Sequence, residues 1–327
     1  MRNTIKIAFL LSILILSFSE KLNYVNESNW GSEVCKSGKH QSPINLPKKE
    51  QCEPVNQVSI EEISYTPVIN EKLQYFHDYK FMVDTSKNGY IKIKKEGEIF
   101  KFNLHDIHFH LNSEHTIDGV LYKMEAHLVH TLDKECQDKT GKNQYLVIGL
   151  IFDSSVTNQV YDKTPFLKLF NFDTQEVIPE LKFNEFYEDI NNTFYFYEGG
   201  LTTPGCDETV NWIVVDKIFG MNSEVFTIFK NYVGQYYPDG NNRKIQALND
   251  RTIYYVDNSK VVQSKSESQK TFYWKIVTIF VIIALLLYIC KDDNKNVKIE
   301  ENTEKQNDNY QQLREVSVKE NSKNKDN

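Results

Sequence analysis

Residues 104–130, LHDIHFHLNSEHTIDGVLYKMEAHLVH, carry six of the eight histidines of this 327-residue chain. Side chains two residues apart on a β-strand point to the same face, so His108 and His110 project together. His127 follows 17 residues after His110, about one hairpin loop and a second strand away. The stretch therefore predicts two neighbouring strands that bring three imidazoles to one place.

Three neutral imidazoles without a fourth protein ligand are typical of an open zinc site, in which water takes the fourth position. A single histidine is more often an ordinary core or surface residue, but the clustering argues against that interpretation. A closed structural zinc site is a second alternative, and such sites are often rich in cysteine. The nearby cysteines, Cys52 and Cys136, form no CxxC pair, so an open metal site is favoured.

Two carboxylates stand at the spacing needed to orient these ligands. Glu125 lies two residues before His127, and Asp106 lies two residues before His108, so each shares a strand face with its histidine. A carboxylate in this position accepts a hydrogen bond from the second ring nitrogen of the ligand and fixes its tautomer. We therefore predict that Asp106 and Glu125 support the metal site.

The rest of the chain favours a single β-rich domain. Runs rich in β-branched and aromatic residues predict strands at 80–84, 90–94, 99–104, 106–111, 125–131, 144–152, 193–198 and 210–215. Helix-like spacing occurs at 161–170 and 223–232. The net charge of −7 and the lack of a phosphate-binding or nucleic-acid motif argue against nucleic acid as a partner.

Several short motifs follow one another in a set order. They are QSPIN at 41–45, IHFH at 107–110, SEHT at 113–116, EAHLVH at 125–130, LTTP at 201–204, VNWIV at 210–214 and NRKIQALNDR at 242–251. With the three histidines intact, this series resembles the α-class carbonic anhydrases over about residues 24–251. The resemblance implies a large twisted, mainly antiparallel central sheet with short peripheral helices and a zinc cleft.

The resemblance further implies reversible hydration of CO2 to bicarbonate and a proton, by attack of zinc-bound hydroxide on CO2. The zinc ligands would be His108, His110 and His127. The hydroxyl of Thr202 would accept a hydrogen bond from the hydroxide, because its own proton is donated to Glu114. This arrangement aims the oxygen lone pair at the substrate.

Other pocket residues follow from the same resemblance. Thr203 would contact bicarbonate or active-site water. Tyr79 aligns with the histidine that passes the proton to buffer in fast members of the family. Because a phenol has an unperturbed pKa near 10, His77 is a candidate substitute, with a plain surface histidine as the alternative. The apolar wall beside CO2 would comprise Val129, Val147, Leu201, Val210 and Trp212, which also suit ordinary core packing.

The two ends of the chain predict secretion and membrane attachment. Residues 1–19 read as a signal peptide, with basic residues before an apolar run. After an ectodomain at 20–259 and a linker at 260–271, the apolar segment 272–290 is near the lower length limit for a membrane-spanning helix. The polar tail 291–327 is expected to be disordered. We expect a single-pass protein at the cell surface or a secretory or vacuolar membrane, with its catalytic domain extracellular or lumenal.

The cysteines fit an oxidising compartment. The resemblance pairs Cys35, before QSPIN, with Cys206, after LTTP, as in extracellular members of the family. Cys290 would lie at the inner membrane boundary, which makes Cys52 and Cys136 candidates for a second pair by exclusion.

Two N-glycosylation sequons lie in the expected outer domain, at Asn26 and Asn191. Both are consistent with exposure to the secretory pathway. Chance matches are nevertheless common in an asparagine-rich chain.

Two other functions are alternatives to the anhydrase. A carbonic-anhydrase-like ectodomain without activity would serve in adhesion or signalling, but such domains typically lose a zinc histidine, and all three are present here. A zinc hydrolase for another substrate would need a general base above a larger pocket, and no HExxH motif provides one. The sequence does not indicate an oligomeric state.

Overall fold

The computed structural model describes residues 22–54, 58–69, 74–76, 80–85, 87–136, 143–156, 186–258, 273–283 and 306–307. It divides the chain into two compact units, Met1–Ser259 and Lys260–Asn327. The expected signal peptide, linker and helix at 161–170 lie outside the described residues, as do His77, Tyr79 and Cys290.

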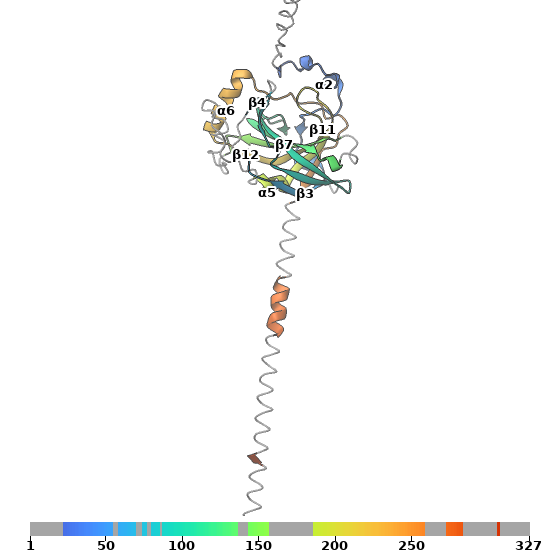
Figure 1. Ribbon diagram of the computed structural model, residues 1–327, viewed down its shortest axis with the longest axis vertical. Coiled ribbons are helices and arrows are strands. Elements are labelled where there is room, and N and C mark those ends of the chain that lie inside the picture. Colours follow the sequence, from blue (N-terminus) through green and yellow to red (C-terminus); the bar gives the residue numbers. More distant parts are fainter. Residues whose placement is uncertain are drawn as a thin grey trace, which may run out of the picture. The chain divides into compact units, whose positions relative to one another are not determined.

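A large twisted sheet forms the centre of the first unit (Figure 1). Its strands are β2 (Glu53–Pro54), β3 (Val58–Tyr65), β4 (Gln74–Phe76), β5 (Lys80–Asp84), β6 (Gly89–Lys95), β7 (Glu98–Leu111), β9 (Met124–Leu132), β10 (Tyr145–Asp153), β11 (Thr193–Gly199), β12 (Val210–Gly220) and β13 (Tyr254–Asp257). A separate parallel pair joins β1 (Asn45–Leu46) to β8 (Thr116–Ile117).

The strand order confirms the predicted fold class. The main path runs β2-β13-β11-β12-β10-β9-β7-β5-β4, and β6 pairs with both β3 and β7. Within this sheet the β10–β12 and β13–β2 pairs are parallel, and the other pairs are antiparallel. Each predicted strand coincides with one of these strands or lies largely within it.

The helices described in the first unit are short and lie outside the sheet. They are the 3-10 helices η1 (Glu27–Trp30), η2 (Lys49–Gln51) and η3 (Lys134–Cys136), and the α-helices α2 (Glu33–Ser37), α5 (Tyr187–Asn192) and α6 (Ser223–Tyr236). In α6, Val225, Phe229 and Val233 recur every four residues and bury one face. The Asn222 side chain accepts a hydrogen bond from the Glu224 amide and caps its start.

Strands β9 and β10 are buried on both faces, and the sequence of β10 accordingly reads as a nearly continuous apolar run. Along β10, Leu146 and Ile148 belong to one buried cluster, whereas Val147 belongs to the other. Along β9, Leu128 packs into the first cluster and Val129 into the second. Since side chains alternate along a strand, the histidine-bearing face of β9 is the face of Val129.

Strand β7 contains one extra residue, His105. Leu104 of β7 pairs with His130 of β9, and Asp106 of β7 pairs with Val129 of β9. His105 therefore has no paired residue on β9. Residues 100, 102 and 104 face the core before this point, and residues 107, 109 and 111 face it afterwards. A one-residue β-bulge therefore joins the two strands predicted at 99–104 and 106–111 into a single strand.

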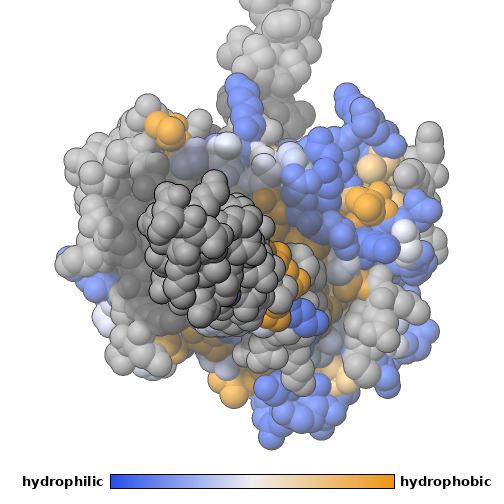
Figure 2. All heavy atoms as spheres, turned by 90° about the horizontal axis from the view of Figure 1, so that it is seen from below, coloured by the Kyte–Doolittle hydropathy of each residue, from blue (hydrophilic) through white to orange (hydrophobic). Residues whose placement is uncertain are grey.

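On the face of the molecule in Figure 2, hydrophilic residues gather along the right and lower edges, and hydrophobic residues are visible near the centre and in smaller groups at the edge. In the second unit, residues 273–283 form a helix. Within the described part of the chain, no helix combines the length and apolar character that crossing a membrane requires.

Candidate active site

Strands β7 and β9 bring the three predicted ligand histidines together. His108 and His110 lie on β7, and His127 lies directly opposite His108 on β9. Nitrogen atoms of all three rings lie within 4.8 Å of one another, and Nδ1 of His127 is 3.2 Å from Nε2 of His108. The three side chains are almost completely buried.

Each ligand histidine is held through its other ring nitrogen. Nδ1 of His108 lies 2.8 Å from Oδ1 of Asp106, and Nε2 of His127 lies 2.9 Å from Oε1 of Glu125. Nδ1 of His110 lies 2.9 Å from the backbone carbonyl oxygen of Asn241. A carboxylate or carbonyl oxygen only accepts, so each of these nitrogens donates a hydrogen.

The tautomers set by those bonds leave three nitrogen lone pairs facing one another. Burial also lowers the pKa of His127, which favours its neutral form. Convergent lone pairs on three neutral, oriented imidazoles are the donor set that a divalent zinc ion takes in an open site. The residues present therefore fit a metal ion.

A second group, comprising His115, Glu125 and His127, also places three potential ligand atoms close together. Both ring nitrogens of His115 are already engaged, Nδ1 with Oε1 of Glu125 at 2.8 Å and Nε2 with the Tyr197 hydroxyl at 2.7 Å. The carboxylate of Glu125 is likewise occupied by hydrogen bonds. The first group is therefore the candidate metal centre.

Glu125 is the most heavily hydrogen-bonded group at the site. Its Oε1 accepts from the rings of His115 and His127, and its Oε2 accepts from the backbone amides of Glu114 and His115 at 2.9 and 2.8 Å. Burial works to raise the pKa of Glu125, but the two imidazoles outweigh it and hold this pKa well below the usual range. The carboxylate is therefore ionised and fixed.

A glycine makes room for this carboxylate. Gly149 on β10 pairs with His127 on β9. A Cβ atom at Gly149 would lie only 2.7 Å from Oε1 of Glu125. Any larger residue there would push the carboxylate away from His127.

Glu114 and Thr202 meet beside the histidines. Oε1 of Glu114 accepts a hydrogen bond from the Arg243 amide at 2.8 Å. Burial raises the pKa of Glu114 to about 7, against the opposing influence of His127, the Arg243 amide and the Thr202 hydroxyl. Oε2 of Glu114 accepts no hydrogen bond of standard length from the described residues.

A pocket of about 250 Å³ opens over the candidate metal centre. A water molecule occupies about 30 Å³ of the liquid, so the pocket holds a small substrate together with water. The residues lining it are His105, Asp106, His108, His127, Val129, Thr131, Tyr145, Val147, Leu201, Thr202, Thr203, Pro204 and Trp212. Of the predicted apolar wall, Val210 alone does not line the pocket, and it packs behind the wall in the same buried cluster as Val129 and Trp212.

Sequence reasoning missed three contributors to the site. The backbone oxygen of Asn241 orients His110, and the side chain of Asn241 bonds the backbone of Leu111 and Phe109. Tyr197 holds His115, and His105 enters the pocket. A backbone contact leaves no residue-type signature, but the change of phase in the apolar pattern after Leu104 was a readable sign of the bulge.

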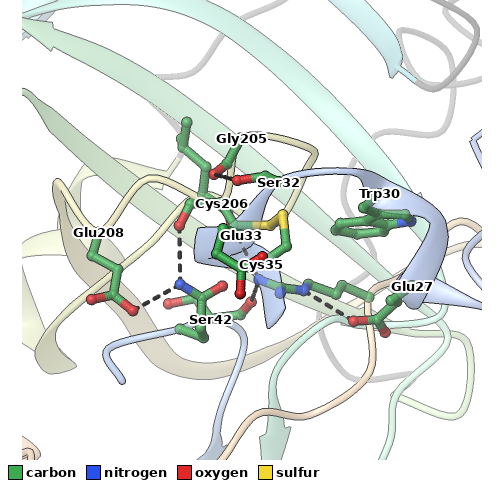
Figure 3. The surroundings of a disulfide bond; sticks show 12 residues. Glu27, Trp30, Ser32, Glu33, Cys35, Ser42, Gly205, Cys206 and Glu208 are labelled. Atoms are coloured by element: carbon green, nitrogen blue, oxygen red, sulfur yellow. Dashed lines mark hydrogen bonds and ion pairs between the residues drawn. A yellow bond between two sulfur atoms is a disulfide. The ribbon is translucent and has the colours of Figure 1, made fainter. Parts of the chain in front are cut away.

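The predicted bond between Cys35 and Cys206 is present, with 5.1 Å between the Cα atoms and 171 residues between the cysteines in sequence. Figure 3 shows how it ties the amino-terminal segment to the loop that follows Thr202. Beside it, the Ser32 hydroxyl donates to the Gly205 carbonyl at 3.2 Å. The loop that carries Thr202 and Thr203 is thus anchored at its far end.

The predicted pairing of Cys52 with Cys136 is wrong, because both are free. Cys52 packs against the buried cluster that contains Val129, whereas Cys136 packs against the other cluster. Burial, together with Asp216 and Glu50, also raises the pKa of Cys52 to about 11. A protonated thiol is a poor partner for disulfide formation.

Replacing Cys35 by serine is expected to destabilise the protein by about 2–5 kcal/mol, because the bond closes a long loop in the unfolded chain. Urea unfolding followed by tryptophan fluorescence measures this difference. The matched control is Cys136→Ser, which should leave the unfolding midpoint nearly unchanged. Equal midpoints for wild type and Cys35→Ser would show that the bond does not contribute.

A second pocket, of about 260 Å³, shares no lining residue with the first. Its lining mixes basic and acidic side chains, among them His40, Lys95, Glu198, Asp250 and Arg251. Arg251 is committed to backbone carbonyls, including those of Leu248, Ala247 and Glu198. The pocket offers no convergent set of ligand atoms.

The fold and the donor set define a β-sheet protein with a three-histidine group in a pocket that could hold a metal ion. A family model described as eukaryotic-type carbonic anhydrase matches residues 25–257. The chain therefore belongs to the carbonic anhydrase family.

Relatives from distant organisms agree with this assignment. The chain is 30% identical over 244 residues to a carbonic anhydrase from Nostoc sp.. The aligned region covers 70% of this chain and 82% of that protein. It is 29% identical over 249 residues to alpha carbonic anhydrase 3 from Arabidopsis thaliana, with 71% and 81% covered.

Solved structures support the fold. The α-carbonic anhydrase from Thermovibrio ammonificans, solved with the inhibitor sulfanilamide, aligns with a TM-score of 0.50 and 27% identity over 71% of this chain and 96% of that one. A halotolerant carbonic anhydrase from Dunaliella salina aligns with a TM-score of 0.55 and 23% identity, covering 68% and 89%.

Proposed function

We propose that this protein is a zinc enzyme that catalyses the reversible hydration of CO2 to bicarbonate and a proton. The observation that carries the proposal is the set of three lone pairs, on His108, His110 and His127, that converge at the base of a small pocket beside Thr202. Membership of the carbonic anhydrase family supports the same reaction.

The three histidines would hold the zinc ion, since their rings are oriented and neutral. When bound, zinc makes a coordinated water acidic and so supplies the nucleophile at neutral pH, a chemistry for which carbonic anhydrase is itself the standard example. Asp106, Glu125 and the Asn241 carbonyl keep the three rings aimed at the ion.

Thr202 and Glu114 orient the attacking water. The Thr202 hydroxyl would donate its proton to the Glu114 carboxylate, with which it interacts, and would therefore accept a hydrogen bond from the water. The water is then held with a lone pair directed into the pocket. The Arg243 amide fixes one carboxylate oxygen of Glu114, which keeps the pair in place.

The apolar side of the pocket suits CO2. Val129, Val147 and Trp212 line it, and all three are nearly fully buried. CO2 is small, linear and uncharged, so it gains from an apolar surface and needs no charged partner. Thr203 and the polar rim would contact the bicarbonate product.

We also propose that the catalytic domain faces an extracellular or lumenal space, on a single-pass protein with a cleaved signal peptide. The Cys35–Cys206 bond supports an oxidising compartment. The sequon asparagines Asn26 and Asn191 are exposed, as N-glycosylation requires. Partial protease digestion and glycosidase treatment of intact cells would test this topology.

The function is tested by stopped-flow CO2 hydration with the full chain produced in an oxidising host. Wild type should bind one zinc ion, lose its activity after chelation and recover it when zinc is restored. Thr202→Val keeps the shape of the side chain but removes the hydroxyl, and we expect kcat/KM to fall by about 100-fold with zinc content unchanged. A folded, zinc-loaded wild type without activity would instead favour a non-catalytic binding domain.

A further inference from the structure

Hydration of CO2 releases one proton per turnover, and the site that releases it is enclosed. The ligand histidines and Glu114 are each 5% exposed or less. A proton set free there needs a carrier that reaches both the pocket and the solvent. The inference about this proton carrier rests on the proposed function. It concerns a residue with no role in the bond-forming chemistry described above.

The bulge in β7 places a histidine at this boundary. His105 lies between two segments of opposite phase, since Leu104 before it and Ile107 after it both face the core, and it has no paired residue on β9. Its side chain is 55% exposed and lines the same pocket as Thr202 and Thr203. Bulges commonly re-aim a side chain beside an active site in this way.

The Asp106 carboxylate orients this histidine. Nδ1 of His105 lies 2.9 Å from Oδ2 of Asp106, whose other oxygen accepts from Nδ1 of His108. A carboxylate oxygen accepts, so Nδ1 of His105 carries a hydrogen and Nε2 is the basic nitrogen. A buried carboxylate on one nitrogen also stabilises the imidazolium formed when the other nitrogen takes a proton.

We propose that His105 carries the product proton from the active site to the solvent. Bond formation gives bicarbonate, and the water that replaces it must lose a proton before the next turnover; that proton passes through pocket water to Nε2 of His105. The imidazolium then donates the proton to a buffer base at the exposed side and returns to the neutral ring. No electron is transferred, and the sum is CO2 and water giving bicarbonate and a protonated buffer.

The other titratable groups that line the pocket are less suited to this role. His108 and His127 are committed to the metal centre, and Asp106 is buried between two imidazoles. Tyr145 on β10 also lines the pocket. Imidazole is the side chain whose ordinary protonation range lies nearest neutral pH, so it both gains and loses a proton readily there.

The decisive variant is His105→Ala in the zinc-loaded full chain, measured by stopped flow at low and high buffer concentration. We expect kcat at low buffer to fall by about 10-fold or more, while kcat/KM for CO2 stays near wild type because bond formation does not use His105. A high concentration of imidazole buffer should restore kcat. An equal fall in kcat and kcat/KM would overturn the proposal, because it would indicate only a positioning role through Asp106.

His40→Ala is the matched control. His40 is also a partly exposed histidine beside an aspartate, 3.7 Å from Asp250, but it lines the other pocket. We expect its kinetics to match wild type at every buffer concentration. His77→Ala tests the rival assignment, and a low-buffer defect in that variant with none in His105→Ala would overturn the proposal.

A measurement independent of turnover completes the test. Histidine-selective NMR of the zinc-loaded full chain should show one ring, assigned by its loss in His105→Ala, that titrates between about pH 5 and 8. A ring that keeps one protonation state across this range overturns the role of His105. A folded, zinc-loaded wild type that does not hydrate CO2 overturns the proposed function, and this role with it.

Discussion

Replacing His108 by alanine is expected to abolish stoichiometric zinc binding and to lower CO2 hydration by roughly 1,000-fold or more, since the reaction depends on the metal-activated nucleophile. Two lone pairs remain in the variant, too few for an open site that needs three protein ligands. Atomic absorption after gel filtration measures the zinc, and stopped flow measures the rate. A His108→Ala protein that retained both would show that the metal lies elsewhere.

His115→Ala is the control that separates the two possible metal groups. His115 belongs to the second group with Glu125 and His127, but both its nitrogens are engaged with protein partners. We expect this variant to keep one zinc ion per chain although it is less stable. Loss of zinc in His115→Ala with retention in His108→Ala would reverse the assignment.

The second large effect is expected for Glu125→Ala. The substitution leaves four buried donors without their acceptor, two on imidazole rings and two on backbone amides. Each orphaned buried donor costs about 1–3 kcal/mol. Partial relaxation makes the sum smaller than four such terms, so we expect a loss of about 4 kcal/mol or more in unfolding free energy.

The Glu125→Ala substitution should also lower the affinity for zinc, because the ring of His127 loses the carboxylate that orients it. Loss of such a support typically weakens metal binding by about 10–100-fold. Urea unfolding and competition with a chelating dye measure the two effects. Glu61→Ala, at an exposed position on β3, is the control and should change neither quantity. Unfolding free energies that match for Glu125→Ala and Glu61→Ala would contradict the structural account.

The sequence predicted those parts of the site that depend on strand periodicity. Residues two apart share a face, so His108, His110, Asp106 and Glu125 could be placed relative to one another without a structure. The positions of Thr202 and Glu114 came from the family resemblance. They could not be derived from spacing, because the two residues meet through the packing of segments far apart in the chain.

The parts that could not be predicted depend on backbone and packing. The support of His110 is a carbonyl oxygen, which every residue type offers. The need for glycine at position 149 arises from a side chain on the neighbouring strand. The predicted pairing of Cys52 with Cys136 was wrong. It was reached only because these two cysteines remained after the other three had been assigned, and such counting ignores that their thiols pack against different buried clusters.

The extra residue in β7 also makes this strand tolerant of the loss of one residue at that position. An insertion or deletion in a central strand normally inverts every side chain beyond it. Removing His105 would instead join Leu104 to Asp106 with both residues still opposite His130 and Val129. The alternation would then run unbroken from Phe100 to Leu111. Loss of this one residue would therefore change the chemistry at the mouth of the pocket while the histidine-bearing face stays in register with β9.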